Sequence, residues 1–286
     1  MSSVVIQSDS LRLEVRQDVG AGVSDFSVRV GGRWQALWRR AAGCDNAPAD
    51  MACTVLAPWT NRIASGKFEF GGRLWNLPTR GPGHTADYGI VKDLAWTVLD
   101  RGPDSVRLER EVGAGEAGWP WAFRARVRYE VMREELRAEL EVMSRSNAPM
   151  PVGFGFAPVW LRHLGAYDDD VSIDVGMGES VDANTERDEC LVSRAGAGEI
   201  CWRRSGVAAS WTCSPEFSHV VVRTPGVRGA DGVRSMASVF EVQPVTMAGA
   251  GFEMLAHAEA AGGLAVLQSG ETMRGIWSVR VQRMGE

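Results

Sequence analysis

The chain has 286 residues, and its 31 basic and 36 acidic side chains leave a formal net charge of −5 at pH 7. This mild negative charge gives no electrostatic reason to expect nucleic acid as a partner. No apolar run approaches the length of a membrane span, and the N-terminus lacks the apolar core of a signal peptide, so we expect a cytoplasmic protein without a membrane partner.

The cysteines of the chain also fit a cytoplasmic protein. The five cysteines are odd in number and scattered, and no Cys-x-x-Cys pair occurs among them. Reduced thiols fit this pattern better than a disulfide framework or a zinc site, and no metal or organic cofactor is implied. The positions are Cys44, Cys53, Cys190, Cys201 and Cys213.

Two short strands, Leu11–Val15 and Phe26–Val30, are expected before the first hairpin. In that hairpin the runs Phe68–Phe70 and Arg73–Trp75 carry apolar side chains on either side of a two-glycine turn, Gly71-Gly72. The pattern therefore predicts a tight antiparallel hairpin about one quarter of the way along the chain.

Polar residues flank this hairpin. Asn61 and Arg62 lie just before its first strand, and Tyr88 lies in the loop after its second strand. A guanidinium held at the base of a hairpin can offer five donors to a polyhydroxylated or anionic ligand. A surface arginine that caps a turn is the competing interpretation of Arg62.

The clearest strands come next. In Phe123–Val131 every odd-numbered residue is apolar or aromatic and every even-numbered one is charged, and Leu136–Val142 repeats the alternation in the opposite parity. This pattern predicts two half-buried antiparallel strands joined by a turn across Met132–Glu135. Three further strands are expected after these two and one before them: Val106–Val112, His219–Arg223, Leu264–Gln268 and Ile276–Gln282.

No segment carries a sustained helical stripe of apolar residues. Many short strands separated by glycine-rich turns are typical of an all-β protein built as a large antiparallel β-sandwich. No repeat, low-complexity tract or linker divides the chain, so a single domain over residues 1–286 is expected.

Several motifs resemble the aldose 1-epimerase (galactose mutarotase) family. Pro58–Ile63, followed by Gly66 and Phe68–Phe70, is similar to the family's Pro-Trp-x-Asn-Arg-Ile segment. Further similar segments follow in the family's order: Gly118–Phe123, Asn147–Pro158, Gln243–Thr246 and Gly270-Glu271. The resemblance covers most of the chain and implies the galactose mutarotase-like supersandwich fold and a small carbohydrate or sugar-like ligand.

The resemblance also implies site residues. Interconversion of sugar anomers needs a base at the anomeric hydroxyl and an acid at the ring oxygen. Arg62 matches the family's sugar-binding arginine, and Asp188 matches its sugar-binding aspartate. The family's two histidines and its catalytic glutamate are replaced by Tyr88, Ala157 and Gln243. Alanine cannot transfer a proton, and glutamine is not a base at pH 7.

Neighbouring residues are candidates to replace the lost groups. Glu241 lies two residues before Gln243, so on a strand both side chains project from one face, about 7 Å apart. A solvated or arginine-paired carboxylate is the competing interpretation of Glu241. Tyr88 and His84 are the candidate acids, because phenol and imidazole groups can donate protons, although Tyr88 could instead bind ligand or fill the volume of the missing imidazole. Asn61, Gln243 and Lys92 are further candidate ligand contacts.

Three functions fit these residues. The first is an aldose 1-epimerase-like isomerase with substituted catalytic groups. The second is a catalytically silent sugar-binding module that kept the cleft. The third is an enzyme of another class on the same scaffold, such as a lyase or hydrolase acting on a lactone or cyclic acetal. The sequence indicates no oligomeric state.

Overall fold

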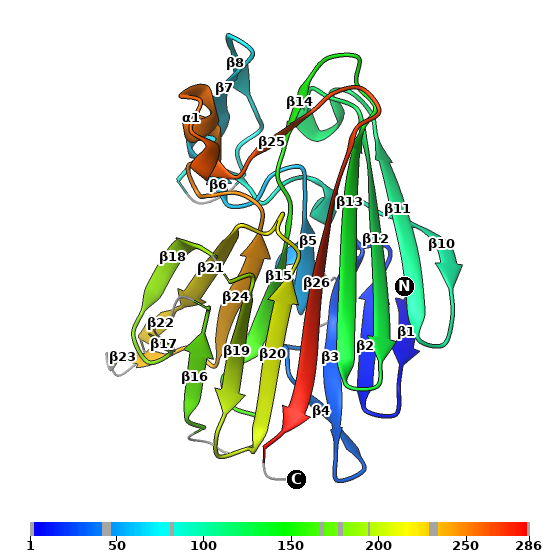
Figure 1. The fold of residues 1–286 in the computed structure, drawn as a ribbon, viewed down its shortest axis with the longest axis vertical. Coiled ribbons are helices and arrows are strands. Elements are labelled where there is room, and N and C mark those ends of the chain that lie inside the picture. The colour runs from blue at the N-terminus through cyan, green and yellow to red at the C-terminus, as the bar shows by residue number, and fades with distance from the viewer. Residues whose placement is uncertain are drawn as a thin grey trace.

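The computed structural model describes residues 3–41, 47–80, 83–165, 169–176, 180–193, 195–228 and 234–284. Within these residues the chain forms two nine-stranded antiparallel sheets that lie face to face (Figure 1). The expected large antiparallel β-sandwich is therefore confirmed. Cys44 lies outside the described residues, and the other four cysteines are free thiols.

The first sheet carries the residues discussed below as a site. Its strand order is β1-β2-β3-β5-β15-β24-β21-β18, with β4 paired to β3. Every pairing is antiparallel. The strands are β1 (Ser3–Gln7), β2 (Leu11–Arg16), β3 (Gly22–Val30), β4 (Arg33–Ala36), β5 (Cys53–Leu56), β15 (Gly155–Leu161), β24 (Val239–Val245), β21 (His219–Thr224) and β18 (Arg187–Val192).

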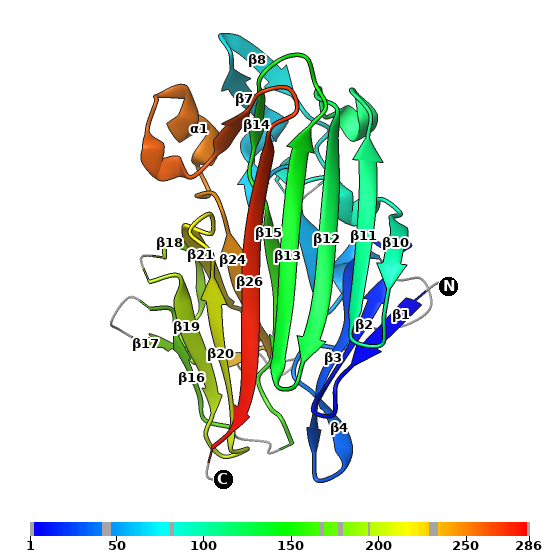
Figure 2. The same cartoon turned by 45° about the vertical axis from the view of Figure 1, so that its right-hand side comes forward.

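The second sheet has the order β10-β11-β12-β13-β26-β20-β19-β16-β17. Its long strand β26 runs between β13 and β20 over most of the height of the molecule (Figure 2). The strands are β10 (Thr97–Arg101), β11 (Ser105–Val112), β12 (Phe123–Met132), β13 (Glu135–Ser144), β26 (Thr272–Arg283), β20 (Val207–Cys213), β19 (Ala197–Trp202), β16 (Val171–Asp174) and β17 (Ser180–Asp182).

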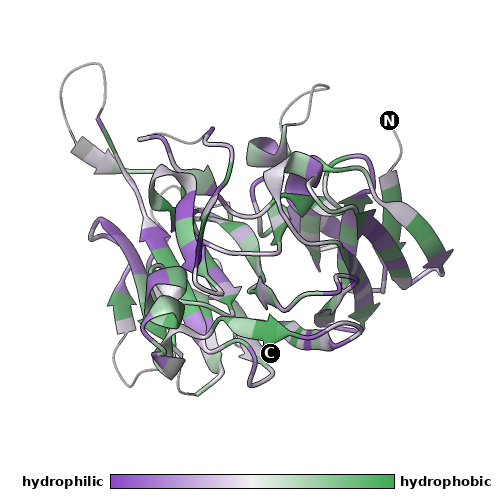
Figure 3. Cartoon of the chain, turned by 90° about the horizontal axis from the view of Figure 1, so that it is seen from above, coloured by the Kyte–Doolittle hydropathy of each residue, from purple (hydrophilic) through white to green (hydrophobic). Residues whose placement is uncertain are grey.

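Alternation along β12 and β13 follows the sequence prediction. Every odd-numbered residue of β12 from Phe123 to Val131 is buried, and the even-numbered residues of β13 from Leu136 to Val142 are buried opposite them. The outward positions carry charges that pair across strands, as Arg126 does with Glu109 at 2.6 Å. Hydrophilic and hydrophobic bands alternate along strands of the sandwich in Figure 3.

Short elements close one end of the sandwich. The predicted hairpin is present as β7 (Lys67–Phe70) and β8 (Arg73–Asn76), and α1 (Gly251–Ala256) packs against it through Phe68 and Phe252, whose ring centres are 4.4 Å apart (Figure 1). Among the described residues no helix is long and apolar enough to cross a membrane. The other short elements are β6 (Arg62–Ile63), β9 (Ala86–Asp87), β14 (Met150–Val152), β25 (Ala265–Leu267), β22 (Gly226–Arg228), β23 (Arg234–Met236), η1 (Pro48–Asp50), η2 (Ala64–Gly66), η3 (Val91–Asp93), η4 (Glu116–Gly118) and η5 (Ala260–Gly262).

All the strands expected from the sequence are present, most of them longer by one to several residues. Strands that alternate weakly in the sequence were not foreseen. The strands of the two large sheets that were not foreseen are β1, β4, β5, β10, β15, β16, β17, β18, β19, β20 and β24, and three of them, β15, β24 and β18, carry candidate site positions.

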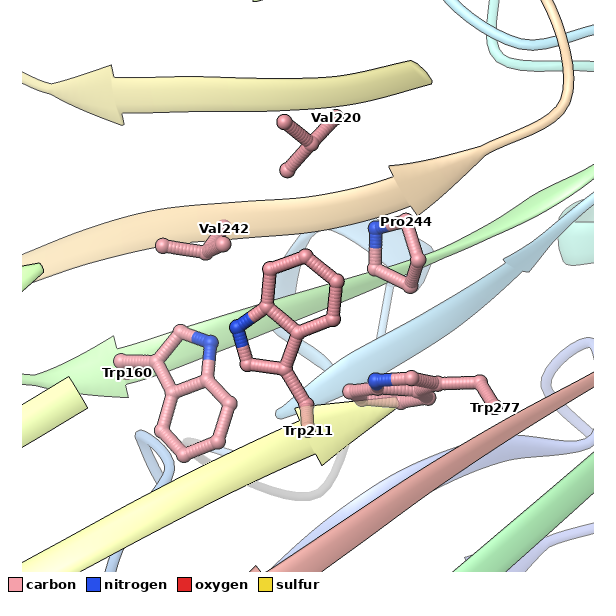
Figure 4. Close-up of a pocket in the computed structure, with 6 residues that line it drawn as sticks. All are labelled: Trp160, Trp211, Val220, Val242, Pro244 and Trp277. Atoms are coloured by element: carbon pink, nitrogen blue, oxygen red, sulfur yellow. The ribbon is translucent and has the colours of Figure 1, made fainter. Parts of the chain in front are cut away.

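Aromatic side chains fill the space between the two sheets. Trp277 of β26 stacks on Trp38 and on Phe156 of β15, with ring centres 5.9 and 5.4 Å apart. A gap beside Trp277 leaves no room for a water molecule, so this part of the interior is dry packing and not a binding pocket (Figure 4). The gap is lined by Trp160, Trp211, Val220, Val242, Pro244 and Trp277.

Replacement of Trp277 by alanine tests how far the fold depends on this layer. Because the indole is 2% exposed and touches both sheets, Trp277→Ala is expected to lower the free energy of unfolding by about 3–5 kcal/mol. Leu99→Ala, at a position 42% exposed on β10, should change it by less than about 0.5 kcal/mol. Urea denaturation followed by circular dichroism measures both, and equal losses would contradict the described core.

Candidate functional site

Side chains on one face of the first sheet point away from the core between the sheets. In β24 the core-facing residues Val242 and Pro244 alternate with Glu241 and Gln243, which therefore lie on the outer face. The sequence prediction that Glu241 and Gln243 share a face follows directly from this alternation.

The strand register arranges the outer face in rows. Gln243 lies opposite Val221, and Val221 lies opposite Cys190. Gly155 pairs with Val245 and Val159 with Glu241, so Ala157 lies beside Gln243 in the same row. We call Ala157, Gln243, Val221 and Cys190 the inner row.

A second row lies next to the inner row, further along the strands. Glu241 is opposite Arg223, and Arg223 is opposite Asp188. We call Glu241, Arg223 and Asp188 the charged row. The structure thus brings together two residues predicted for the site, Glu241 and Asp188, and places between them an arginine that the sequence analysis missed.

The charged row forms the wall of an open cavity of about 410 Å³. Three guanidinium groups and three carboxylates line this cavity, so its charged side chains are balanced. The lining residues are Arg62, Glu186, Arg187, Asp188, Arg223, Pro225 and Glu241.

Ion pairs fix the charged row. The carboxylate of Asp188 accepts from Arg223 Nε at 2.6 Å and lies 3.5 Å from Arg62 Nη1. Arg223 reaches in the other direction to Glu241 Oε2, at 3.4 Å from Nη1. Exposed pairs such as Arg62–Asp188 contribute little stability, whereas the side chain of Arg223 is only 15% exposed and loses less of its electrostatic interaction to solvent. The network therefore positions the two carboxylates.

Glu241 uses only one of its oxygens in this network. Oε2 accepts from Arg223 and also from the amide Nε2 of Gln243. Oε1 has no partner among the described residues, and Glu241 lines the cavity. The free oxygen is thus available to a ligand, and Gln243 serves as a donor that orients the carboxylate. This contact leaves the buried Oε1 of Gln243 without a hydrogen-bond partner.

Tyr88 lies over the inner row. Its ring packs against the apolar cluster of Leu56, Val221 and Val245, as Ala157 and Cys190 also do. The guanidinium carbons of two arginines lie near the ring, that of Arg62 at 5.6 Å and that of Arg223 at 5.3 Å from its centre.

The hydroxyl of Tyr88 is buried and has no well-aligned hydrogen-bond partner in the described part of the chain. Burial raises the pKa of Tyr88, and the nearby positive charges of Arg223 and Arg62 oppose this increase without cancelling it. The hydroxyl is therefore protonated at neutral pH, and because it is buried and Tyr88 does not line the cavity, the structure does not place it as an acid toward a ligand there.

The backbone that carries Tyr88 is fixed on both sides. Tyr88 itself has a positive φ of 60°, and its N–H donates to Asn61 O at 2.9 Å. The next residue, Gly89, has φ 70° and lies so close to Ala57 that a Cβ there would overlap the carbonyl group. Ile90 N–H donates to the same carbonyl at 2.8 Å. Only glycine fits at position 89, and this close approach sets the direction of the Tyr88 side chain.

Five of the predicted site residues do not line the cavity: Tyr88 and Gln243 belong to the neighbouring inner row and its cover, and Asn61, Lys92 and His84 have other surroundings. Asn61 is 7% exposed and donates to Met247 O at 3.2 Å, so its amide holds two loops together. Lys92 lies on η3, where its ammonium group pairs with Asp93 at 2.6 Å. His84 is exposed, and no hydrogen bond or ion pair joins it to the cavity residues in the described structure. His84 is therefore close to Tyr88 in the sequence but does not line the cavity.

Other cavity residues were missed from the sequence. Arg223 ends the predicted strand His219–Arg223, and its charge after three valines was the available signal. Glu186, Arg187 and Pro225 come from the ends of β18 and β21. Within the described ranges, no group of three or more His, Cys, Asp or Glu side chains is placed to hold a metal ion.

Comparison with solved structures defines the class of fold. A galactose mutarotase-like protein from Clostridium acetobutylicum superposes with a TM-score of 0.80 at 16% identity, over 99% of this chain and 95% of that one. The GalM/aldose epimerase homologue from C. elegans gives 0.78 at 15% identity, over 99% and 100%. Galactose 1-epimerase from Lactobacillus acidophilus gives 0.71 at 11% identity, over 99% and 94%. The fold is the galactose mutarotase-like sandwich.

Sequence comparison then identifies the family. The model of the aldose 1-epimerase family matches residues 6–184, more than half of the chain, so the chain belongs to the aldose 1-epimerase family. A comparison with curated proteins gave no match. The matched segment includes Arg62, Tyr88 and Ala157 but ends before the charged row.

Gly89→Ala tests the close approach that directs Tyr88, with Gly71→Ala as the matched control. Both glycines have positive φ, 70° and 61°, but only position 89 is crowded, whereas a Cβ at position 71 has open space around it. Gly71→Ala should cost about 1–2 kcal/mol of stability, and Gly89→Ala roughly 1–3 kcal/mol more. Urea denaturation compares them, and equal costs would mean that the contact with Ala57 is unimportant.

The raised pKa of Tyr88 predicts a pH dependence of stability. The folded protein holds this proton more tightly than the unfolded chain, so the contribution is fully present below the ordinary tyrosine pKa of about 10 and is lost as pH rises through the folded value. Above pH 10 the free energy of unfolding should therefore fall less steeply for Tyr88→Phe than for the wild type. Denaturation series from pH 8 to 11 measure both slopes, and identical slopes would contradict the buried, unpaired hydroxyl.

Proposed function

We propose that the protein binds a small neutral carbohydrate in the charged cavity and interconverts its anomers, with Glu241 as the base and water in the open cavity as the acid. The observation that carries this proposal is the state of Glu241. Its Oε2 is held by Arg223 and Gln243, while its Oε1 is free in a cavity that Arg62 and Asp188 also line.

Charge balance supports a neutral ligand. Three guanidinium groups and three carboxylates line the cavity, and a sugar hydroxyl can accept from the former and donate to the latter. A multiply charged ligand would leave side chains of its own sign uncompensated. A polyhydroxylated ligand of monosaccharide size suits both the alternating donors and acceptors and the cavity volume.

The chemistry needs two proton transfers. Glu241 Oε1 takes the proton of the anomeric hydroxyl while a water molecule in the open cavity gives a proton to the ring oxygen, so the ring C–O bond breaks and the anomeric carbon becomes a carbonyl. Rotation of the carbonyl group and the reverse transfers close the ring as the other anomer.

A silent sugar-binding module is the second candidate, and one observation favours it. The inner row carries Ala157 and Gln243 at the family's acid and base positions, and neither side chain transfers protons at neutral pH. On this account Glu241 and Arg223 hold a ligand without turnover. The proposed lyase or hydrolase activity has no comparable support.

Anomer exchange measured by magnetisation-transfer NMR over a panel of aldoses separates these functions. Exchange above the spontaneous rate is expected for the wild type, with a loss of about 100-fold or more in Glu241→Gln, which removes the base but keeps the shape. Arg62→Ala should weaken sugar binding, and Lys92→Ala, distant from the cavity, should match the wild type.

Three other outcomes would contradict the isomerase proposal in whole or in part. Sugar binding without exchange in the wild type would overturn the isomerase proposal in favour of the binding module. Full exchange in Glu241→Gln would remove Glu241 from its role. The absence of both binding and exchange would exclude simple aldoses and favour a lactone or cyclic acetal as the ligand.

A further inference from the structure

We propose that Tyr88 determines the specificity of this site. Its ring closes the outer face of the first sheet over Val221 and Gln243, so that a ligand binds one row further out, against the charged row. This inference rests on the proposed function and specifies which carbohydrates the cavity admits.

Burial shows that the middle of the inner row is covered, whereas Ala157 and Cys190 at its two ends are half-buried. Val221 and Gln243 point away from the core between the sheets, yet they are only 1% and 2% exposed. Neither they nor Ala157 line the cavity, whereas their neighbours Arg223 and Glu241 do. The Tyr88 ring, packed on the cluster that contains Val221, supplies this cover.

Tyr88 and Ala157 are complementary in size. Both pack on the same apolar cluster of the outer face, and the single methyl group of alanine leaves space for a phenol ring above it. A side chain as large as histidine at position 157 would compete with that ring for the same volume. The two residues therefore act as a pair in which the large one occupies the space given up by the small one.

The cover is fixed in place. Hydrogen bonds from Tyr88 N to Asn61 O and from Ile90 N to Ala57 O, together with the close approach of Gly89, hold the loop on both sides of the ring. A ligand therefore meets the edge of a stationary barrier. Substituents that would extend toward Val221 and Gln243 are excluded, so we expect the site to disfavour disaccharides whose second ring would have to lie there.

Paired substitutions at Tyr88 separate the ring from the hydroxyl. Tyr88→Phe keeps the ring and should keep the wild-type preference for monosaccharides over disaccharides, measured as a ratio of dissociation constants by NMR titration. Tyr88→Ala should lower that ratio at least tenfold. Tyr88→Gly tolerates the φ of 60° and should do the same, which gives a second variant if the alanine variant fails to fold. A ratio that changes in Tyr88→Phe, or stays constant in Tyr88→Ala and Tyr88→Gly, would overturn the proposal.

Cys190 gives a readout that does not depend on sugar binding. Its half-buried thiol packs on the same apolar cluster as Tyr88 and also lies near Asn61 Nδ2 and Met247 O, and burial raises its pKa. Reaction of Cys190 with a neutral maleimide, identified by mass spectrometry of the labelled peptide, should accelerate at least tenfold in Tyr88→Ala and Tyr88→Gly and not in Tyr88→Phe. Cys190→Ser confirms the peptide assignment.

The two measurements distinguish an error in the proposed ligand class from an error in the steric role of Tyr88. If the wild type binds no sugar while Cys190 is unmasked by loss of the ring, the proposed ligand class is wrong and the steric role of Tyr88 stands. If sugars bind but the Cys190 labelling rate and the selectivity ratio are the same in all variants, Tyr88 is not the barrier and the inference fails.

Discussion

The ion pairs of Arg223 with Asp188 and Glu241 are the interaction on which the site depends. One guanidinium joins carboxylates from the strands on both sides of its own, so the antiparallel register of β18, β21 and β24 determines which charges meet. Because Arg223 is mostly buried, the loss of either partner would leave a poorly solvated charge, and the network is held together for that reason. It leaves one oxygen of Glu241 free in the cavity.

The strands of the first sheet face two environments. Their inner faces pack Phe156, Trp160 and Val242 into the dry interior, while their outer faces carry the inner and charged rows. Because the core holds these strands rigidly, the site residues on their outer faces are held in defined positions. Tyr88 comes from a loop, but Gly89 and Ala57 hold that loop almost as firmly.

The sequence predicts those parts of the fold in which one face is buried and the other solvated. The strands β12 and β13 alternate cleanly for that reason, and the hairpin at Gly71-Gly72 follows from its turn. By contrast, β24 is covered on both faces from Val242 to Val245, and β15 carries apolar residues at its half-buried outward positions as well as in the core, so the alternation of both strands is weak in the sequence. Arg62, Asp188 and Glu241 were predicted as site residues, whereas Arg223 becomes recognisable only through the cross-strand register. Lys92 was misplaced because the chain turns at Gly89 and carries η3 toward Gly20, where the backbones of Lys92 and Gly20 are in close contact.

A crystal structure of the protein soaked with a monosaccharide tests the central claim most directly. The account predicts a sugar in the charged cavity, with a hydroxyl within hydrogen-bond distance of Glu241 Oε1, other hydroxyls on Arg62 and Asp188, and the Tyr88 ring still over Val221 and Gln243. A sugar seated over Val221 and Gln243, with Tyr88 swung aside and Glu241 uninvolved, would contradict it.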